Sequence, residues 1–281
     1  MVNFNGTLLA KGTAFLDESN RGLRYGDALF ETIRVVNSKI FFWEPHYLRL
    51  MASMRIMRLP IPMIFTMEHL EEDILKTLKA NSLEAKAARV RLTVFREAGG
   101  FYTPTNKEVS FIIEVSALET PFYTNSQEHY EVELFKDHYV NSGLLSTLKS
   151  SNKLVHILAG IYAKENGYHN CLLINEQKNI IEASNGNLFL IKDNKIKTPP
   201  ITEGCLNGIL RKQLIEIIKK TSEFELVEEP ISPFELQKAD EMFTTNVISG
   251  ITSISKYRKK NYDTTIAKTL LGRLNAHVRL L

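Results

Sequence analysis

The first 117 residues alternate between stretches with strand spacing and stretches with helix spacing. Residues 30–36 and 39–43 are rich in β-branched and aromatic side chains, and Asn37-Ser38 between them is a turn sequence, so together they predict a hairpin. Residues 67–81 carry apolar side chains every four residues behind Thr66, which indicates a capped amphipathic helix. We also expect strands at residues 2–9, 89–96 and 109–115, a polar loop at residues 18–22, and a helix that opens at Glu44 and Pro45.

Residues 118–127 mix proline, threonine, asparagine and serine without periodicity, so we expect a linker there. The linker separates a domain of residues 1–117 from a domain of residues 128–281. In the second domain the pattern predicts strands at 132–135, 225–229 and 241–254, the last interrupted at Thr244-Thr245-Asn246, and helices over 209–220, from Ser232, and over 264–280. Strands and helices form separate groups more often than they alternate, which favours an α+β fold over a doubly wound sheet.

Composition and charge exclude several classes of protein. A hydrophobic content of 44% and a charged content of 24% are ordinary for a globular protein. A net charge of +3, spread evenly, gives no reason to expect nucleic acid as a partner. No apolar run approaches membrane-spanning length and the N-terminus lacks a secretory pattern, so no membrane contact is expected. Cys171 and Cys205 lack CxxC spacing and fit a reducing, cytoplasmic location.

Three chemically distinct features follow one another between residues 148 and 211. Lys149 precedes a helix start, Glu182 ends a strand, and Leu206-Asn207-Gly208 is a turn that leads into the helix at Ile209. A lysine amine can condense with the aldehyde of pyridoxal 5'-phosphate, a carboxylate can pair with its ring nitrogen, and a helix N-terminus can hold its phosphate. The segment therefore contains the parts of a pyridoxal-phosphate site.

The residue strings are more specific than this spacing. LKSSNKL, EASNGNLF and TPPITEGCLNGILR, together with RGLRYGDALFETIRV and HYLRL in the N-terminal half, resemble the class IV (fold type IV) pyridoxal-phosphate enzymes. That family includes branched-chain aminotransferases, D-amino-acid aminotransferases and aminodeoxychorismate lyases. The resemblance covers nearly the whole chain. It implies two α+β domains with the cofactor in the cleft between them, and a homodimer whose active sites borrow loops from the neighbouring subunit.

The resemblance also gives roles to the cofactor-binding candidates. Lys149 matches the reactive Schiff-base lysine of the family, although a lysine before a helix is in most proteins only a solvated cation, and Lys153 is its competitor. Glu182 matches the carboxylate at the pyridine nitrogen, Arg49 matches the phosphate-binding arginine, and Asn187 is expected to tie down a turn. The other expected contacts are the backbone amides of Ile209 and Leu210 at the phosphate, Leu206 against the ring, and the Asn246-Val247 turn, where valine offers no hydroxyl.

Tyr25, Arg91 and Arg96 are the candidates for binding the substrate carboxylate. Two arginines five residues apart on one strand point to opposite faces, so only one of them is expected to line the site. Arg91 resembles the arginine of branched-chain enzymes, and Arg96, beside a Gly-rich loop, resembles that of D-amino-acid aminotransferases and lyases. Each arginine also has an ordinary alternative as a structural ion-pair residue.

Two reactions fit these residues. In an aminotransferase, Lys149 moves the α-proton of an amino acid to the cofactor, and a 2-oxo acid is then aminated in a second half-reaction. In an aminodeoxychorismate lyase, the same carbanion expels pyruvate and leaves 4-aminobenzoate. The string FETIRV and Tyr25-Gly26-Asp27 are compatible with the aminotransferase, whereas Asn246, Arg96 and the Leu206–Ile209 turn resemble the lyase branch. We predict an aminotransferase for branched-chain or D-amino acids, with the lyase as the alternative.

The sequence favours neither a binding protein without the cofactor nor a metalloprotein. A binding protein that has kept the fold without the cofactor requires the loss of Lys149, Glu182 or Arg49, and all three residues are present. No metal site is expected, because the histidines share no ligand spacing with cysteines or acidic residues. The expected ligands are therefore pyridoxal 5'-phosphate and small amino and 2-oxo acids.

Overall fold

The computed structural model describes residues 1–125 and 129–280. The chain divides into two compact units, the first made of Met1–Pro121 and Lys149–Asn152, and the second of Phe122–Leu148 and Lys153–Leu281. The first boundary falls inside the expected linker 118–127, of which residues 126 and 127 lie outside the described residues. The hydrophobic pattern did not predict that four residues around Lys149 join the first unit.

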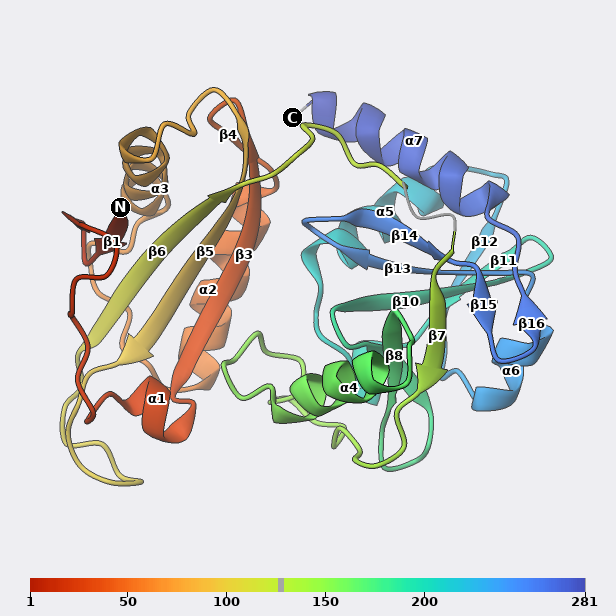
Figure 1. Ribbon diagram of the computed structural model, residues 1–281, viewed down its shortest axis with the longest axis horizontal. Coiled ribbons are helices and arrows are strands. Elements are labelled where there is room, and N and C mark those ends of the chain that lie inside the picture. The colour runs from red at the N-terminus through yellow and green to blue at the C-terminus, as the bar shows by residue number, and fades with distance from the viewer. Residues whose placement is uncertain (126–128, 281) are drawn as a thin grey trace. The chain divides into compact units, whose positions relative to one another are not determined.

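The first unit is a six-stranded antiparallel sheet with helices on one face (Figure 1). Its strands are β1 (Val2–Phe4), β2 (Thr7–Leu9), β3 (Ala28–Val36), β4 (Lys39–Ile40), β5 (Ala87–Arg96) and β6 (Val109–Ala117), in the order β2-β1-β6-β5-β3-β4. Its helices are α1 (Arg21–Tyr25), α2 (Trp43–Ile56) and α3 (Met67–Ala80).

Alternation along β5 explains why this sheet has one apolar and one polar face. Val90, Leu92 and Val94 are fully buried, whereas Arg91 and Thr93 between them are only half-buried. Since successive strand residues point to opposite faces, the apolar set lies under α2 and α3 and the polar set lies on the other face. That second face carries Arg91, one of the candidates for binding the substrate carboxylate.

The second unit is built on a branched sheet in which β10 is the central strand. β10 pairs with β9 near its start, with β11 near its end and with β13 along most of its length. The strands of this unit are β7 (Glu131–Leu134), β8 (Asn170–Ile174), β9 (Ile180–Ala183), β10 (Gly186–Lys192), β11 (Lys195–Thr198), β12 (Glu225–Glu228), β13 (Glu241–Asn246), β14 (Gly250–Ile254), β15 (Lys256–Tyr257) and β16 (Lys260–Asn261).

Helices cover this sheet and close its core. They are α4 (Leu154–Glu165), α5 (Ile209–Lys219), α6 (Pro233–Lys238) and α7 (Thr265–Leu280), with a 3₁₀ turn at Ile201–Glu203. α4 packs on β8, and α5 and α7 pack on β13 and its neighbour β14. Within the described part of the chain, no helix is long and apolar enough to cross a membrane. The α+β fold class expected from the sequence is confirmed.

Three local expectations were wrong. The polar loop at 18–22 contains the start of α1, because the Asn20 side chain caps that helix by accepting from the Leu23 backbone N–H. The strand expected at 39–43 ends at Ile40, because the following aromatic residues turn into the core and begin α2. The interruption expected at 244–246 belongs to β13, where buried threonines take their place in the ladder, and the turn comes three residues later.

Candidate active site

Lys149 is fixed on the outer edge of β3 in the first unit. The Phe30 N–H donates to the Lys149 carbonyl at 2.8 Å, and the Ser151 N–H donates to the Ala28 carbonyl at 2.9 Å. The backbone of this short segment is therefore held like an added antiparallel strand. The Lys149 Nζ lies 4.5 Å from the centroid of the Phe30 ring, so strand pairing directs the amine to that ring.

Arg91 contacts the same ring. Its Cζ lies 3.8 Å from the Phe30 centroid, which puts the arginine and lysine cations within about 8 Å of each other. Burial lowers the pKa of Arg91 and Glu114 opposes this shift, but a guanidinium remains charged at neutral pH. Lysine and arginine therefore present two cationic groups together on the polar face of the sheet.

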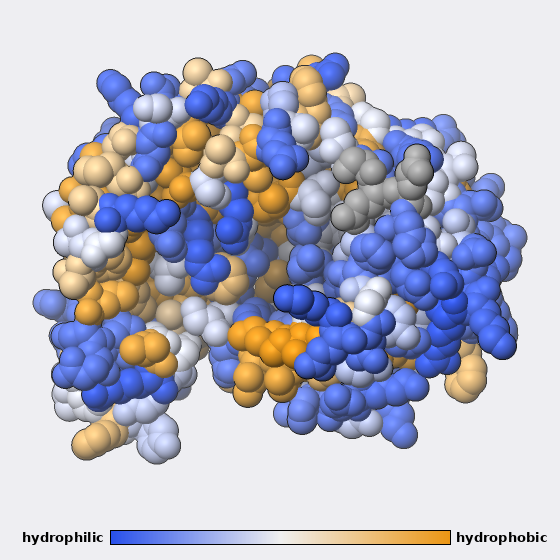
Figure 2. Space-filling view, viewed as in Figure 1, coloured by the Kyte–Doolittle hydropathy of each residue, from blue (hydrophilic) through white to orange (hydrophobic). Residues whose placement is uncertain are grey.

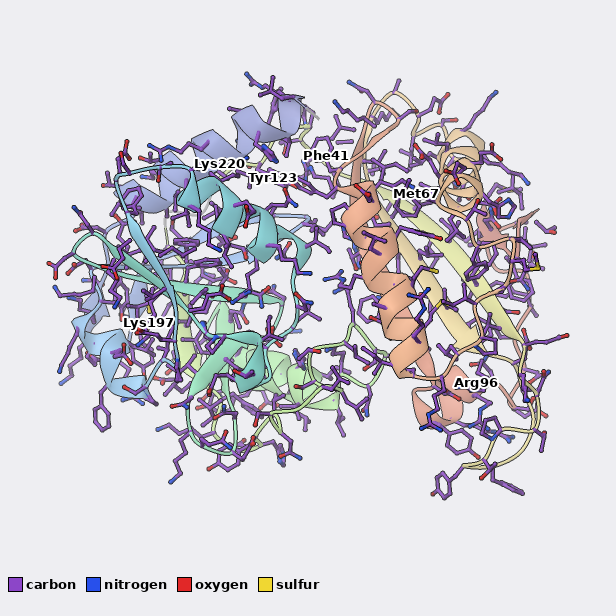
Figure 3. The ribbon with its side chains drawn as sticks, turned by 180° about the vertical axis from the view of Figure 1, so that it is seen from behind. Phe41, Met67, Arg96, Tyr123, Lys197 and Lys220 are labelled. Carbon is purple, nitrogen blue, oxygen red and sulfur yellow. The ribbon has the colours of Figure 1, made fainter. Side chains whose placement is uncertain are left out.

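The Arg96 guanidinium donates hydrogen bonds to groups of the protein. Its Nε donates to Asp27 at 2.9 Å, and its two terminal nitrogens donate to the Arg58 and Met57 carbonyls at 3.1 Å each. Figure 3 shows Arg96 at the end of β5, near the end of α2. These carbonyls follow α2, on the face opposite Arg91, as the five-residue spacing predicts.

Tyr25 ends α1 and belongs to a ring cluster at the Gly-rich loop. The Arg21 Cζ lies 4.9 Å from its centroid and the Tyr102 ring lies 5.7 Å away. Arg21 also donates to the Gly99 carbonyl at 3.1 Å and the Phe101 carbonyl at 2.5 Å. The loop therefore rests on α1, with Tyr25 half-buried between them.

Arg49 is held by a buried carboxylate that the sequence analysis did not select. Its guanidinium makes two hydrogen bonds to Glu31, one of them from Nε at 2.8 Å, and His46 Nδ1 lies 2.7 Å from the same carboxylate. Burial alone raises the pKa of Glu31, but Arg49 and His46 outweigh it and lower the pKa to about 2. Burial lowers the pKa of His46 although Glu31 opposes this shift, and the charges of Arg49 and Lys149 add to the lowering. The group fixes the direction of the Arg49 side chain.

Glu182 lies on β9 in the second unit, almost fully buried among hydrogen-bond donors. Its Oε2 accepts from the Leu206 N–H at 3.0 Å and from Asn187 Nδ2 at 3.4 Å, and its Oε1 lies 3.1 Å from His156 Nε2. A carboxylate has about four acceptor positions. The described donors use three of them, so one position remains for a further donor.

The turn before α5 contacts the Glu182 carboxylate through the Leu206 N–H. Asn187 Nδ2 donates to the Leu206 carbonyl at 2.8 Å, so both backbone groups of Leu206 are held, and the structural role predicted for Asn187 is confirmed. At Gly208 an added Cβ would lie 2.0 Å from Asn187 Oδ1, which explains the need for glycine. The amides of Ile209 and Leu210 follow in the first turn of α5, where a helix provides them no internal partner.

Thr147 holds this turn within the second unit. The Asn207 N–H donates to the Thr147 carbonyl at 3.2 Å, and Thr147 precedes Lys149 by two residues. Lys153 directs its amine to the Leu148 carbonyl at 3.4 Å. The Lys149 amine, by contrast, lies against the Phe30 ring, and Lys149 stays the candidate that the family resemblance selects.

Asn246 closes the turn between β13 and β14. Its Oδ1 accepts from the Ile248 and Ser249 amides at 3.0 and 2.9 Å, and the Val247 carbonyl accepts from the Tyr123 hydroxyl at 3.0 Å. The Ile248 and Ser249 amides are therefore bound within the turn. These three contacts do not use the Val247 amide.

Sequence reasoning missed Phe30, Glu31 and His156. Each lies in or beside a string that carries the family resemblance, but their partners are 15 or more residues away, so spacing did not indicate the contacts. Among the described residues, no group of three or more histidine, cysteine or acidic side chains could hold a metal ion.

Residues 28–257 match the family model described as amino-transferase class IV. The chain belongs to the class IV aminotransferase family. This family depends on pyridoxal phosphate, and the predicted class of enzyme is confirmed.

Relatives in this family are named for different reactions. A putative branched-chain-amino-acid aminotransferase of Methanocaldococcus jannaschii is 29% identical over 90% of this chain and 86% of its own length. An aminodeoxychorismate lyase of Vibrio harveyi is 23% identical over 84% and 85%, and a D-alanine aminotransferase of Listeria monocytogenes is 27% identical over 90% and 86%.

Solved structures share the fold. The branched-chain aminotransferase of Escherichia coli has a TM-score of 0.86 at 24% identity, covering 96% of this chain and 91% of that one. A putative 4-amino-4-deoxychorismate lyase of Legionella pneumophila has a TM-score of 0.84 at 24% identity, covering 95% and 96%. Solved structures named for each of the two reactions therefore share this fold.

Proposed function

We propose that this protein is a pyridoxal 5'-phosphate-dependent aminotransferase that transfers the amino group of a branched-chain amino acid to a 2-oxo acid. The observation that carries the proposal is the contact of both Lys149 and Arg91 with the Phe30 ring. A substrate carboxylate needs a cation near the reactive amine, and Arg91 meets that condition. Arg96 already binds Asp27 and two carbonyls, which supports the branched-chain type over the D-amino-acid type.

The residues present fit the cofactor. Glu182 has one acceptor position beyond its described donors, as a protonated ring nitrogen requires. Arg49 is oriented by its contacts with Glu31, and its guanidinium is the cation that we assign to the phosphate. The other contacts that we assign to the cofactor are a covalent bond from Lys149, phosphate contacts from the Ile209, Leu210 and Val247 amides, a turn held by Asn246, and ring packing by Leu206.

We assign each step of the reaction to residues of this chain. Bound pyridoxal phosphate supplies an electron sink for the negative charge that develops at the substrate α-carbon. The Lys149 amine takes the α-proton from one side and returns a proton, acting as general base and then as general acid. Arg91 holds the α-carboxylate, Tyr25 borders the substrate, and Glu182 keeps a proton on the ring nitrogen.

Aminodeoxychorismate lyase is the alternative. A lyase relative matches 84% of the chain, and Asn246 with the turn before α5 resembles the lyase branch. In this structure, however, the Asn246 side-chain oxygen binds two amides of its own turn. Since that contact is structural, Asn246 gives the lyase little support.

The test is a substrate panel followed by the visible spectrum of the purified holoenzyme. Branched-chain amino acids should bleach the cofactor band, and a 2-oxo acid should restore it, in a ping-pong pattern. Release of pyruvate and 4-aminobenzoate from aminodeoxychorismate, with amino acids inert, would make the protein a lyase. Arg91→Gln should raise KM for the amino acid at least tenfold, whereas the matched Arg96→Gln should lower stability instead.

We also propose a homodimer and a cytoplasmic location. Leu154, Ile157 and Ile161 are 63%, 57% and 47% exposed at helical spacing on α4, and Figure 2 shows apolar side chains gathered over this part of the surface. A second copy covering this face would remove it from water. Light scattering tests the dimer. Cys171 and Cys205 are buried free thiols, which supports a reducing compartment, and cell fractionation tests the location.

A further inference from the structure

His156 makes a contact that the proposed reaction does not yet use. Its Nε2 lies 3.1 Å from Glu182 Oε1. We propose that His156 is a positioning residue, which orients the Glu182 carboxylate toward the ring nitrogen of the cofactor. This inference rests on the proposed function, since it assigns to His156 control of a contact that the proposed cofactor makes.

The two partners come from elements that are packed rigidly against each other. Glu182 lies on β9, between β8 and β10. His156 is in the first turn of α4, whose Ala159 and Ala163 are buried in one apolar cluster with Cys171 of β8. Because residues three apart on a helix share a face, the packing of Ala159 also turns His156 toward the sheet.

The donors are divided unevenly between the two carboxylate oxygens. Oε2 accepts from the Leu206 N–H and from Asn187, whereas His156 is the one described donor to Oε1. A carboxylate held only at Oε2 can rotate about its last bond. A donor at Oε1 removes that freedom, so His156 fixes the plane of the acceptor that a ring nitrogen meets.

The chemistry requires a hydrogen on Nε2, because Glu182 as a carboxylate only accepts. An imidazole with the proton on that nitrogen supplies one donor, and so does the amide of glutamine. Leucine fills a similar volume without a donor. Comparison of glutamine with leucine at position 156 therefore separates the effect of the hydrogen-bond donor from that of the imidazole ring.

The experiment compares His156→Leu, His156→Gln and the exposed α4 control Lys164→Gln with wild type, each reconstituted with pyridoxal phosphate labelled with ¹⁵N in the ring. We expect His156→Leu to bind the cofactor about tenfold more weakly, to lower kcat about tenfold, and to move the ring ¹⁵N resonance. His156→Gln should restore all three toward wild type. Equal urea midpoints show that the fold is kept, and His156→Ala repeats the deletion if the leucine variant does not fold.

Two results would overturn the proposal and are distinguishable. If wild type forms a Lys149-dependent cofactor band but the ring resonance is the same in wild type and His156→Leu, His156 does not position Glu182, although the proposed function stands. The same holds if His156→Gln behaves like His156→Leu. If wild type forms no such band, the proposed function itself fails, and the role of His156 fails with it.

Discussion

Replacing Glu31 by glutamine tests the buried group that holds Arg49. Glutamine has the size of a protonated glutamate but no charge, so the variant removes the negative charge between Arg49 and His46. Arg49, itself 9% exposed, is then left without its counter-charge. We expect the first unit to lose much of its stability.

The magnitude follows from the pKa of Glu31, which is lowered from 4.5 to about 2 in the folded protein. Since one pKa unit corresponds to about 1.4 kcal/mol, the ionised carboxylate contributes about 3 kcal/mol to the free energy of unfolding. Removing one partner of a buried ion pair costs a similar amount, about 3–5 kcal/mol. Both arguments predict a loss of about 3 kcal/mol at pH 7 for Glu31→Gln.

The pH dependence has a definite sign. A carboxylate whose folded pKa is lowered stabilises the protein above its unfolded pKa, and this contribution is lost as pH falls through the folded pKa. The difference between wild type and Glu31→Gln should therefore be full above about pH 5 and fall to roughly half as pH approaches 3.

Tryptophan fluorescence during urea unfolding is a suitable assay. The chain has one tryptophan, Trp43, which is buried at the start of α2 and so reports on the first unit. The control is Glu72→Gln on the exposed face of α3, which should change stability by less than about 0.5 kcal/mol. A loss below about 1 kcal/mol in Glu31→Gln, or a loss that is the same at pH 7 and pH 3, would refute the reasoning.

The structure also predicts the effects of two substitutions and the reactivity of the two cysteines. Gly208→Ala should destabilise the second unit by about 1–3 kcal/mol in urea unfolding and weaken cofactor binding, because its Cβ would lie 2.0 Å from Asn187 Oδ1; unchanged values would contradict this packing. Asn246→Ala should cost about 1–2 kcal/mol in the same assay, since two turn amides lose their acceptor. Burial raises the pKa of both Cys171 and Cys205 to about 12, so neither should react with a thiol reagent at pH 8 until urea unfolds the protein.

The sequence analysis selected the cofactor-binding candidates from residue type and local string. Lys149, Glu182 and Arg49 each stand in a string that resembles the family. The α+β class followed from helix and strand spacing. A turn role for Asn187 was expected from its string, but the turn that it holds contains Leu206, 19 residues further along the chain.

Contacts between distant elements could not be predicted in this way. Glu31 reads as one polar residue in an apolar strand, and its role depends on α2 folding back over that strand. His156 reads as a histidine on a helix, and its partner lies 26 residues further along the chain. The proposed preference for Arg91 over Arg96 depends on the faces of β5, which strand spacing indicated, and on the carbonyls after α2, which it did not.

Covalent trapping of the cofactor tests the central claim most directly. The purified protein is loaded with pyridoxal 5'-phosphate, reduced with borohydride and digested, and the modified residue is found by mass spectrometry. The account predicts a phosphopyridoxyl group on Lys149 in wild type and in Lys153→Ala, and no specific label in Lys149→Ala. A stoichiometric label on Lys153 or another lysine, or none in wild type, would contradict it.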